Sequence, residues 1–242
     1  MTTPVPHAFT GKALAVVDVE GNGRTPAEII EIAVLPITLG SAQATDMRSW
    51  LIRPTAPITP IVTRKVHGIT NADVAECPTW REVRPDVQAA LGDRVLVAHN
   101  ANVEHRVLSA HLPGWAPPMV LDTLRLAKAV WPGLPRYGLD KLIDHAELDT
   151  AALAEQGYHR AAYDTWAAWQ LLRRLVGDSG LDWDGVVRAA APGRIRTGAR
   201  TRRGTVVNQF GTQTALWPPV GESNRPILNE IGSKGATRQE NS

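Results

Sequence analysis

Two acidic side chains stand at the end of the first long apolar segment of this chain. Residues 13–19 form an apolar run of strand length, and Asp18 and Glu20 lie where this run gives way to a turn at 21–23. Alternate side chains of a strand face the same side, so the two carboxylates should point together. Such a pair can bind a divalent cation, although an isolated Asp-x-Glu is more often a pair of solvent-facing charges.

Two further segments place an acid or a histidine where a helix begins. Glu104 follows the apolar strand predicted at 94–98, and His159 and Asp164 enter the last long helix. Taken singly, each acid is explained by the favourable charge of a helix start. Taken together, four carboxylates and one imidazole occur in order at element ends. Carboxylate oxygens favour Mg²⁺ or Mn²⁺, and two such ions can bind both the attacking and the leaving oxygens of a phosphodiester.

The elements that must position these residues predict an α/β domain over residues 12–192. The first three strands have short links and should form an antiparallel meander. Asp122 and Thr123 are expected to cap a helix, Asn100 to cap another, and Trp166 and Trp169 to lie in the core. Strands are predicted at 13–19, 29–37, 47–53, 94–98 and 119–121. Helices are predicted near 60–66, 80–91, 100–111, 123–130, 138–147 and 160–176.

The composition is that of an ordinary globular protein. Of the 242 residues, 43% are apolar and 21% are charged, which is typical of a packed core with a polar surface. The single cysteine, Cys77, excludes an internal disulfide. No window reaches the roughly 18 apolar residues of a membrane span, and no signal peptide is evident. We therefore expect a cytoplasmic protein without a membrane partner.

The two ends of the chain differ from its body. Residues 1–11 are polar with two prolines, and we predict a flexible lead-in. Residues 193–242 carry a charge of +5, whereas the rest of the chain carries −3. This basic tail is poor in apolar anchors, so we predict that it is disordered and loosely attached. Its arginines could add phosphate affinity, or the tail could be solvated without a role.

The order of the motifs resembles the DEDDh (DnaQ-like) 3′→5′ exonuclease superfamily, which includes the proofreading subunit of bacterial replicative polymerases and RNase T. Asp18 and Glu20 match the first motif, and His159 and Asp164 match the third. The resemblance covers roughly residues 13–176. Further similar segments lie at 30–34, 66–70, 77–80, 98–101, 121–124 and 137–142.

The resemblance implies an RNase H-like fold, a mixed five-stranded sheet flanked by helices. It also implies hydrolysis of single-stranded DNA or RNA 3′ ends to nucleoside 5′-monophosphates. His159 would be the general base, and two Mg²⁺ or Mn²⁺ ions would be bound by Asp18, Glu20 and Asp164, with Glu104 at the remaining position. The segments around the terminal nucleotide would supply the substrate-binding residues, namely Val19, Gly21, Asn22, His67 and Asn100.

Two departures from the family pattern bear on activity. Glu104 stands where the family usually has aspartate, and residues 21–23 stand where the family has threonines. Glutamate keeps the oxygen ligand but adds one methylene, so metal preference should shift. The alternative is a nucleic-acid-binding or polymerase-accessory protein with weakened catalysis. In the tail, residues 213–217 faintly resemble peptides that dock on sliding clamps, so a clamp or polymerase is a candidate partner.

Overall fold

A mixed five-stranded sheet forms the centre of the protein, as the sequence predicts. The computed structural model describes residues 3–38, 40–155 and 157–192. The strand order is β5-β3-β2-β6-β7. The pairs β2–β3 and β3–β5 are antiparallel, and the pairs β2–β6 and β6–β7 are parallel. The strands are β2 (Leu14–Gly21), β3 (Ile29–Ile37), β5 (Arg48–Leu51), β6 (Val95–Ala98) and β7 (Val120–Asp122).

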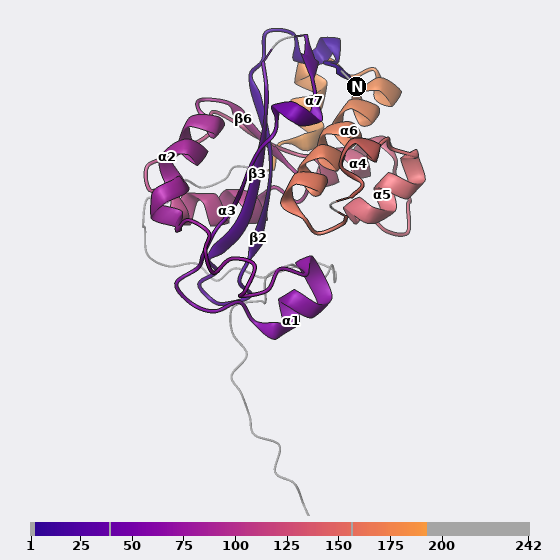
Figure 1. Ribbon diagram of the computed structural model, residues 1–242. Helices are drawn as coiled ribbons and strands as arrows, with labels where there is room; N and C mark the ends of the chain where they lie inside the picture. The colour runs from indigo at the N-terminus through magenta and orange to yellow at the C-terminus, as the bar shows by residue number, and fades with distance from the viewer. Residues whose placement is uncertain (1–2, 39, 156, 193–242) are drawn as a thin grey trace, which may run out of the picture.

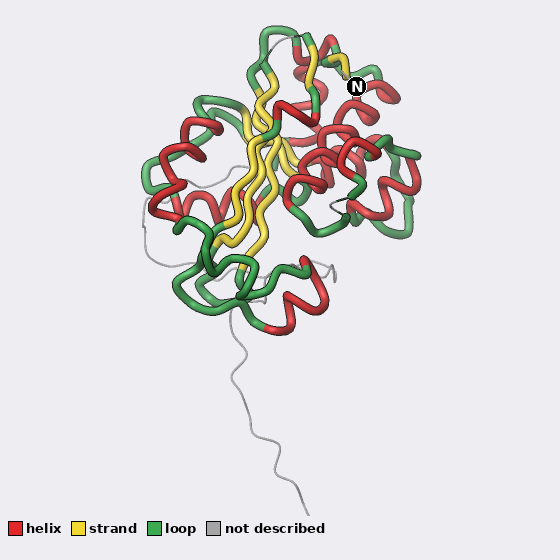
Figure 2. The backbone as a smooth tube through the Cα atoms, viewed as in Figure 1, coloured by secondary structure: helices red, strands yellow, loops and turns green. Residues whose placement is uncertain are grey.

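Helices cover both faces of this sheet (Figure 1). One face is covered by α2 (Trp80–Leu91) and α3 (Asn102–His111). The other face is covered by α6 (Ala161–Ser179), against which α4 and α5 pack. A short helix and a following π-turn lie beside the end of β2 (Figure 2). The remaining helices are α1 (Pro60–Val62), α4 (Thr123–Val130), α5 (Leu139–Ala146) and α7 (Trp183–Ala190), with the π-turn at Thr63–His67.

The burial of the central strands follows from this three-layer arrangement. Every residue of β2 is buried, because one face packs on α2 and α3 and the other on α6. A strand covered on both faces reads as a continuous apolar run rather than an alternating one, and 13–19 is such a run. Trp166 and Trp169 of α6 are buried in the core, as predicted. The acids at the end of β2 therefore stand on rigidly packed backbone.

Several predictions differ from the structure. Within the predicted lead-in, Thr3–Pro4 forms β1, which pairs with β4 (Ser41–Ala42), and the Phe9 side chain is buried against Trp183. Asn100 does not cap α3, because the residue at the cap position is Ala101. Helix α7 was not predicted. Short 3₁₀ turns lie at His7–Phe9, Ala44–Asp46 and Ala151–Leu153.

Other predictions are confirmed or fall outside the described part of the chain. The Asp122 carboxylate accepts the backbone N–H of Leu124 and caps α4, as expected. Within the described ranges, no helix has the length and apolar character to cross a membrane. The predictions for the basic tail and for residues 213–217 concern positions outside the described residues.

Candidate functional site

The first two acids of the candidate site lie at the carboxyl end of β2. Asp18 pairs with Ala33 of β3, and Glu20 pairs with Glu31, so the acids share a face of the sheet. The register shifts between Glu20 and Gly21, which makes a bulge that ends regular pairing next to the site. Both carboxylates are buried, with Glu20 only 2% exposed. Buried backbone on both sides thus fixes where the two carboxylates point.

Helices α3 and α6 bring the other predicted residues to this strand end. Glu104 lies in the first turn of α3 and is 3% exposed, and Asp164 lies in the first turn of α6. The Nδ1 atom of His159 is 4.0 Å from Oδ2 of Asp164. One potential ligand atom each from Glu20, His159 and Asp164 lies within 4.8 Å of the others. Asp18 and Glu104 lie outside this tight group of three.

Electrostatic interactions link Asp18 and Glu104 to the group formed by Glu20, His159 and Asp164. Burial raises the pKa of Asp18 well above its usual value, and the charges of Asp164, Glu20 and Glu104 raise it further. Burial and the charge of Asp164 likewise raise the pKa of Glu20, with Glu31 and Glu104 adding to the shift. Desolvation disfavours the charged form of each acid, and like charges act in the same direction. Four carboxylates in one buried region therefore form a strongly self-repelling cluster.

The other two acids are shifted by the same physical causes. Burial raises the pKa of Glu104 well above its usual value. Burial raises the pKa of Asp164 to about 7, and the charge of Glu31 contributes. A carboxyl group perturbed in this way, next to a cluster of acids, is a marker of a functional site.

The residues present fit divalent cations. Among the described residues, three buried carboxylate oxygens have no hydrogen-bond partner: Asp18 Oδ2, Glu20 Oε1 and Glu104 Oε2. A buried polar atom left without a partner costs free energy, so its presence calls for an explanation. Hard oxygen donors of this kind are those that Mg²⁺ and Mn²⁺ prefer. A cation would both occupy the free oxygens and offset the mutual repulsion of the acids.

An ion pair beside the acids was not predicted from the sequence. The Arg160 guanidinium donates to both oxygens of Glu31, with Nη2 2.8 Å from Oε1 and Nε 3.1 Å from Oε2. The backbone N–H of Ala161 also donates to Glu31 Oε2, at 3.0 Å. Glu31 is buried in β3 opposite Glu20, and Arg160 directly follows His159. A buried glutamate within the apolar run of β3 was the one signal in the sequence that pointed to this contact.

His67 braces the end of β2 through both ring nitrogens. The backbone N–H of Ile69 donates to Nδ1, so Nε2 carries the proton and donates to the Gly21 carbonyl, at 3.2 Å. Burial lowers the pKa of His67, which favours this neutral form. The ring nitrogens are therefore engaged within the protein, and His67 fixes the backbone of Gly21 beside the acids.

The other predicted substrate-binding residues are placed differently from one another. The Val19 side chain is buried in the core below α2 and α3. The Asn22 side chain is fully buried and bonds to Glu28 and to the Ala56 carbonyl. Asn100 has a left-handed backbone with φ of 67°, and its N–H donates to Asp122 Oδ1. The Val19 side chain is thus buried, and both the side chain and the backbone of Asn22 are engaged within the protein. Asn100 follows β6 and is bonded to Asp122.

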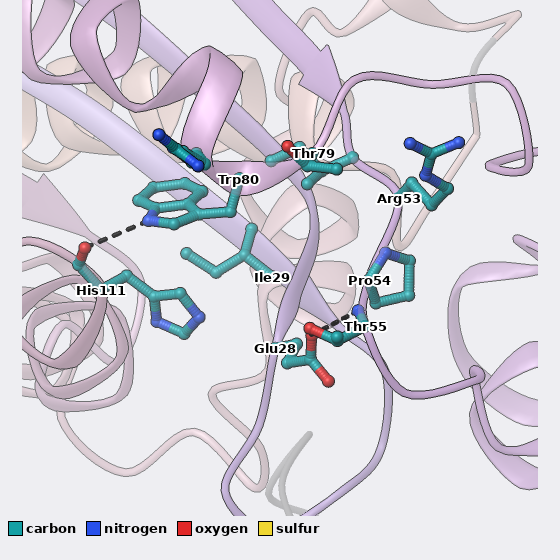
Figure 3. A pocket seen from close by; sticks show the side chains of 10 residues that line it. Glu28, Ile29, Arg53, Pro54, Thr55, Thr79, Trp80 and His111 are labelled. Carbon is teal, nitrogen blue, oxygen red and sulfur yellow. Dashed lines mark hydrogen bonds between the residues drawn. The ribbon is translucent and has the colours of Figure 1, made fainter.

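A pocket of about 550 Å³ is lined by residues at the start of β3, after β5, around the start of α2 and at the end of α3. Figure 3 shows the Trp80 and Ile29 side chains next to each other in its lining, with Trp80 Nε1 donating to the His111 carbonyl. Glu28 also lines it, but its carboxylate accepts hydrogen bonds from Thr55 and Ala56. None of the five predicted catalytic residues lines this pocket. The chemistry is therefore assigned to the acidic cluster and not to this pocket.

Comparisons with known proteins agree with the geometry. A family model described as Exonuclease (RNase T) matches residues 15–172. The epsilon subunit of DNA polymerase III from Aquifex aeolicus is 30% identical over 167 residues, which cover 66% of this chain and 79% of that subunit. The PolC-type DNA polymerase III of Halalkalibacterium halodurans is 31% identical over 170 residues, which cover 68% of this chain. The match spans only 11% of that polymerase.

A solved structure gives the same picture. Exonuclease X, determined in complex with 5′-overhanging duplex DNA, superposes with a TM-score of 0.60 at 29% sequence identity. The superposition covers 73% of this chain and 98% of that chain. The similarity thus extends over nearly the whole of that solved chain.

Proposed function

The chain belongs to the DnaQ-like (DEDDh) exonuclease superfamily, and from this membership we propose that it is a metal-dependent 3′→5′ exonuclease. The substrate would be the 3′ end of single-stranded DNA or RNA, and the product a nucleoside 5′-monophosphate. The family generally uses divalent metal ions, and we propose that two Mg²⁺ or Mn²⁺ ions serve here. The observation that carries the proposal is the set of buried, unpartnered carboxylate oxygens beside His159.

Each polar residue of the site has a proposed task. Asp18, Glu20, Glu104 and Asp164 would hold the ions through their carboxylate oxygens. When bound, the ions supply stabilisation of the charge that develops on the attacking and leaving oxygens. His159 is exposed, with its side chain 47% accessible, so its imidazole can reach solvent and the substrate. It would accept a proton from the attacking water as general base.

The substrate would be held at the carboxyl ends of β2 and β6. Val19 and Gly21 lie in the last part of β2 and Asn22 follows it, and His67 bonds to the Gly21 carbonyl. Asn100 follows β6, which pairs with β2 in the sheet. We propose that this edge of the sheet contacts the terminal nucleotide. Nucleic acid is thus the proposed partner, and the polymerase names among the relatives make an association with a polymerase a further proposal.

Digestion of 5′-labelled oligonucleotides tests this function. Single-stranded DNA and RNA would be incubated with Mg²⁺, Mn²⁺ or EDTA, and the products separated by length. The expected result is a metal-dependent ladder shortened from the 3′ end. Asp18→Ala should lower the rate by roughly a thousandfold, since it removes several kcal/mol of charge stabilisation. Asp86→Ala, an exposed acid of α2, is the matched control and should retain full activity.

The variant Glu104→Asp tests whether Glu104 supports catalysis or weakens it. If Glu104 is a working metal ligand, the wild type cleaves oligonucleotides, and the variant changes the ratio of the cleavage rates measured with Mg²⁺ and with Mn²⁺. The opposite result is a wild type that binds oligonucleotides but makes no product with any metal, while Glu104→Asp cuts. That result would replace the exonuclease proposal with a nucleic-acid-binding protein.

A further inference from the structure

We propose that Glu31 and Arg160 form a positioning pair that sets the place of the His159 imidazole beside Asp164. The inference rests on the proposed role of His159 as general base. Glu31 lies on β3, and Arg160 is the residue at the start of α6. The pair therefore joins the strand next to the acids directly to the segment that carries the base.

The contact between the two residues is unusually complete. Arg160 Nε lies 3.2 Å from Oε1 and 3.1 Å from Oε2 of Glu31, and Nη2 lies 2.8 Å from Oε1. The N–H of Ala161 takes a further position on Oε2. Bonds from a planar guanidinium fork fix orientation as well as distance. Three donors from two consecutive residues thus hold the start of α6 in one position on β3.

Glu31 is not available as a further metal ligand. Both of its oxygens accept hydrogen bonds, whereas Asp18, Glu20 and Glu104 each have a buried oxygen without a partner. Its role must therefore be exerted through Arg160 and Ala161.

A contribution to stability does not by itself explain a buried carboxylate at this position. Glu31 lies within a strand whose other residues are almost all buried and apolar. A buried ion pair is often no more stabilising than apolar side chains of similar volume. Its negative charge also raises the pKa of Asp18, Glu20 and Asp164, so it adds to the repulsion within the cluster. What the pair provides in return is a fixed geometry.

The segment before the pair needs such a fixed point. Gly157 has φ of 74° and His159 has φ of 57°, so both adopt the left-handed region. For a residue other than glycine this conformation is sterically unfavourable, and surrounding contacts must maintain it. The His159 ring itself is exposed, so packing does not hold it. Arg160, one residue later, is where the chain is anchored again.

A double-mutant cycle tests the pair. The rate of oligonucleotide shortening would be measured for wild type, Arg160→Lys, His159→Ala and the double variant. Lysine keeps the charge but lacks the fork. Arg174→Lys is the matched control, because Arg174 makes a comparable pair with Asp178 at 2.9 and 3.0 Å near the far end of α6. Thermal unfolding of each variant checks that the fold is retained.

The loss of activity that we expect depends on the presence of the His159 imidazole. Arg160→Lys should lower kcat by about ten- to a hundredfold with KM within about twofold, as expected for a misplaced catalytic group. Glu31→Gln should act in the same direction, and Arg174→Lys should act like wild type. In the His159→Ala background, Arg160→Lys should cause no further loss, since there is no base left to position. A full additional loss in that background would overturn the proposal, as would a wild-type kcat in Arg160→Lys.

A second measurement is independent of activity. The Cε1–H signal of His159 would be followed by NMR in wild type, Arg160→Lys and Arg174→Lys. We expect the signal to shift or broaden in Arg160→Lys alone, and an unchanged signal would contradict the positioning role. If the wild type cuts no oligonucleotide with any metal, the proposed function fails, while the NMR comparison still decides whether the pair positions His159.

Discussion

At the scale of single residues, the buried carboxylates make the metal-free protein sensitive to pH. The pKa values of Asp18, Glu20, Glu104 and Asp164 are raised by burial, and that of Asp164 reaches about 7. Their protonated forms are thus favoured in the folded state. The associated stability is present below the unfolded pKa of about 4 and is lost as the pH rises through the folded values.

The direction of this pH dependence predicts how divalent cations change the stability of the protein. We expect Mn²⁺ to raise the unfolding temperature more at pH 8, where the acids are charged, than at pH 5. The measurement is thermal unfolding with Mn²⁺ or EDTA at both values of pH. Glu20→Gln removes one of the charges and should reduce the difference between the shifts in unfolding temperature at pH 5 and pH 8. Equal shifts at pH 5 and pH 8 would mean that the acids are not the site of binding.

Residue types and their order were enough to predict the acidic cluster, but not the ion pair next to it. Asp18, Glu20 and Asp164 stand at element ends, where a strand or helix pattern in the sequence already locates them. Glu31 and Arg160 lie 129 positions apart, and each has an ordinary local explanation. Their contact depends on how α6 docks on β3, which no local pattern specifies.

At the scale of elements, His99 links three segments behind the site. Its Nε2–H donates to the Tyr137 carbonyl at 2.9 Å, and its Nδ1 lies 2.9 Å from Thr123 Oγ1. It therefore joins the end of β6 to the start of α4 and to the segment before α5. Burial lowers the pKa of His99 to about 4, so the ring is neutral at pH 7.

The depressed pKa predicts acid-sensitive folding. Between about pH 6.5 and pH 4 the unfolded chain takes up a proton at His99 that the folded chain does not, so stability falls as the pH falls through this window. His99→Gln should cost about 1–3 kcal/mol at pH 7, because it disturbs two hydrogen bonds. That cost should shrink towards pH 4. Denaturant unfolding across this range, with exposed His145→Gln as control, would test it; a cost independent of pH would exclude the linkage.

Elements with a strong apolar pattern were predictable, and those made by distant contacts were not. The run before Asp18 and the capped helix after Thr79 have clear local signals. Strand β1 has only two residues and exists through its pairing with β4. Helix α7 had a usable signal, because Asp182 caps it through the N–H of Gly185.

At the scale of the whole molecule, charge is divided between an acidic body and a basic tail. An exonuclease would have to bind a polyanion, but residues 1–192 carry a charge of −3, whereas residues 193–242 carry +5. Binding to a single strand releases counterions, so the binding constant falls as the salt concentration rises. On logarithmic axes the slope is about −0.7 for each phosphate neutralised. Deleting 193–242 should therefore flatten the salt dependence of oligonucleotide binding. Fluorescence titrations at several salt concentrations would measure the slope, with a variant in which the arginines at 194–203 become glutamine as comparison; an unchanged slope would contradict a role of the tail in binding.

The docking of α6 has a consequence for when activity can begin. During synthesis the acids of β2 emerge early, but Asp164 is far along the chain and reaches them only after α6 has folded onto the sheet. Contacts between segments so distant in sequence form late in folding. A nascent or truncated chain that ends before residue 164 therefore has only part of the acidic cluster. In the proposed exonuclease, hydrolysis would begin only once the domain is complete.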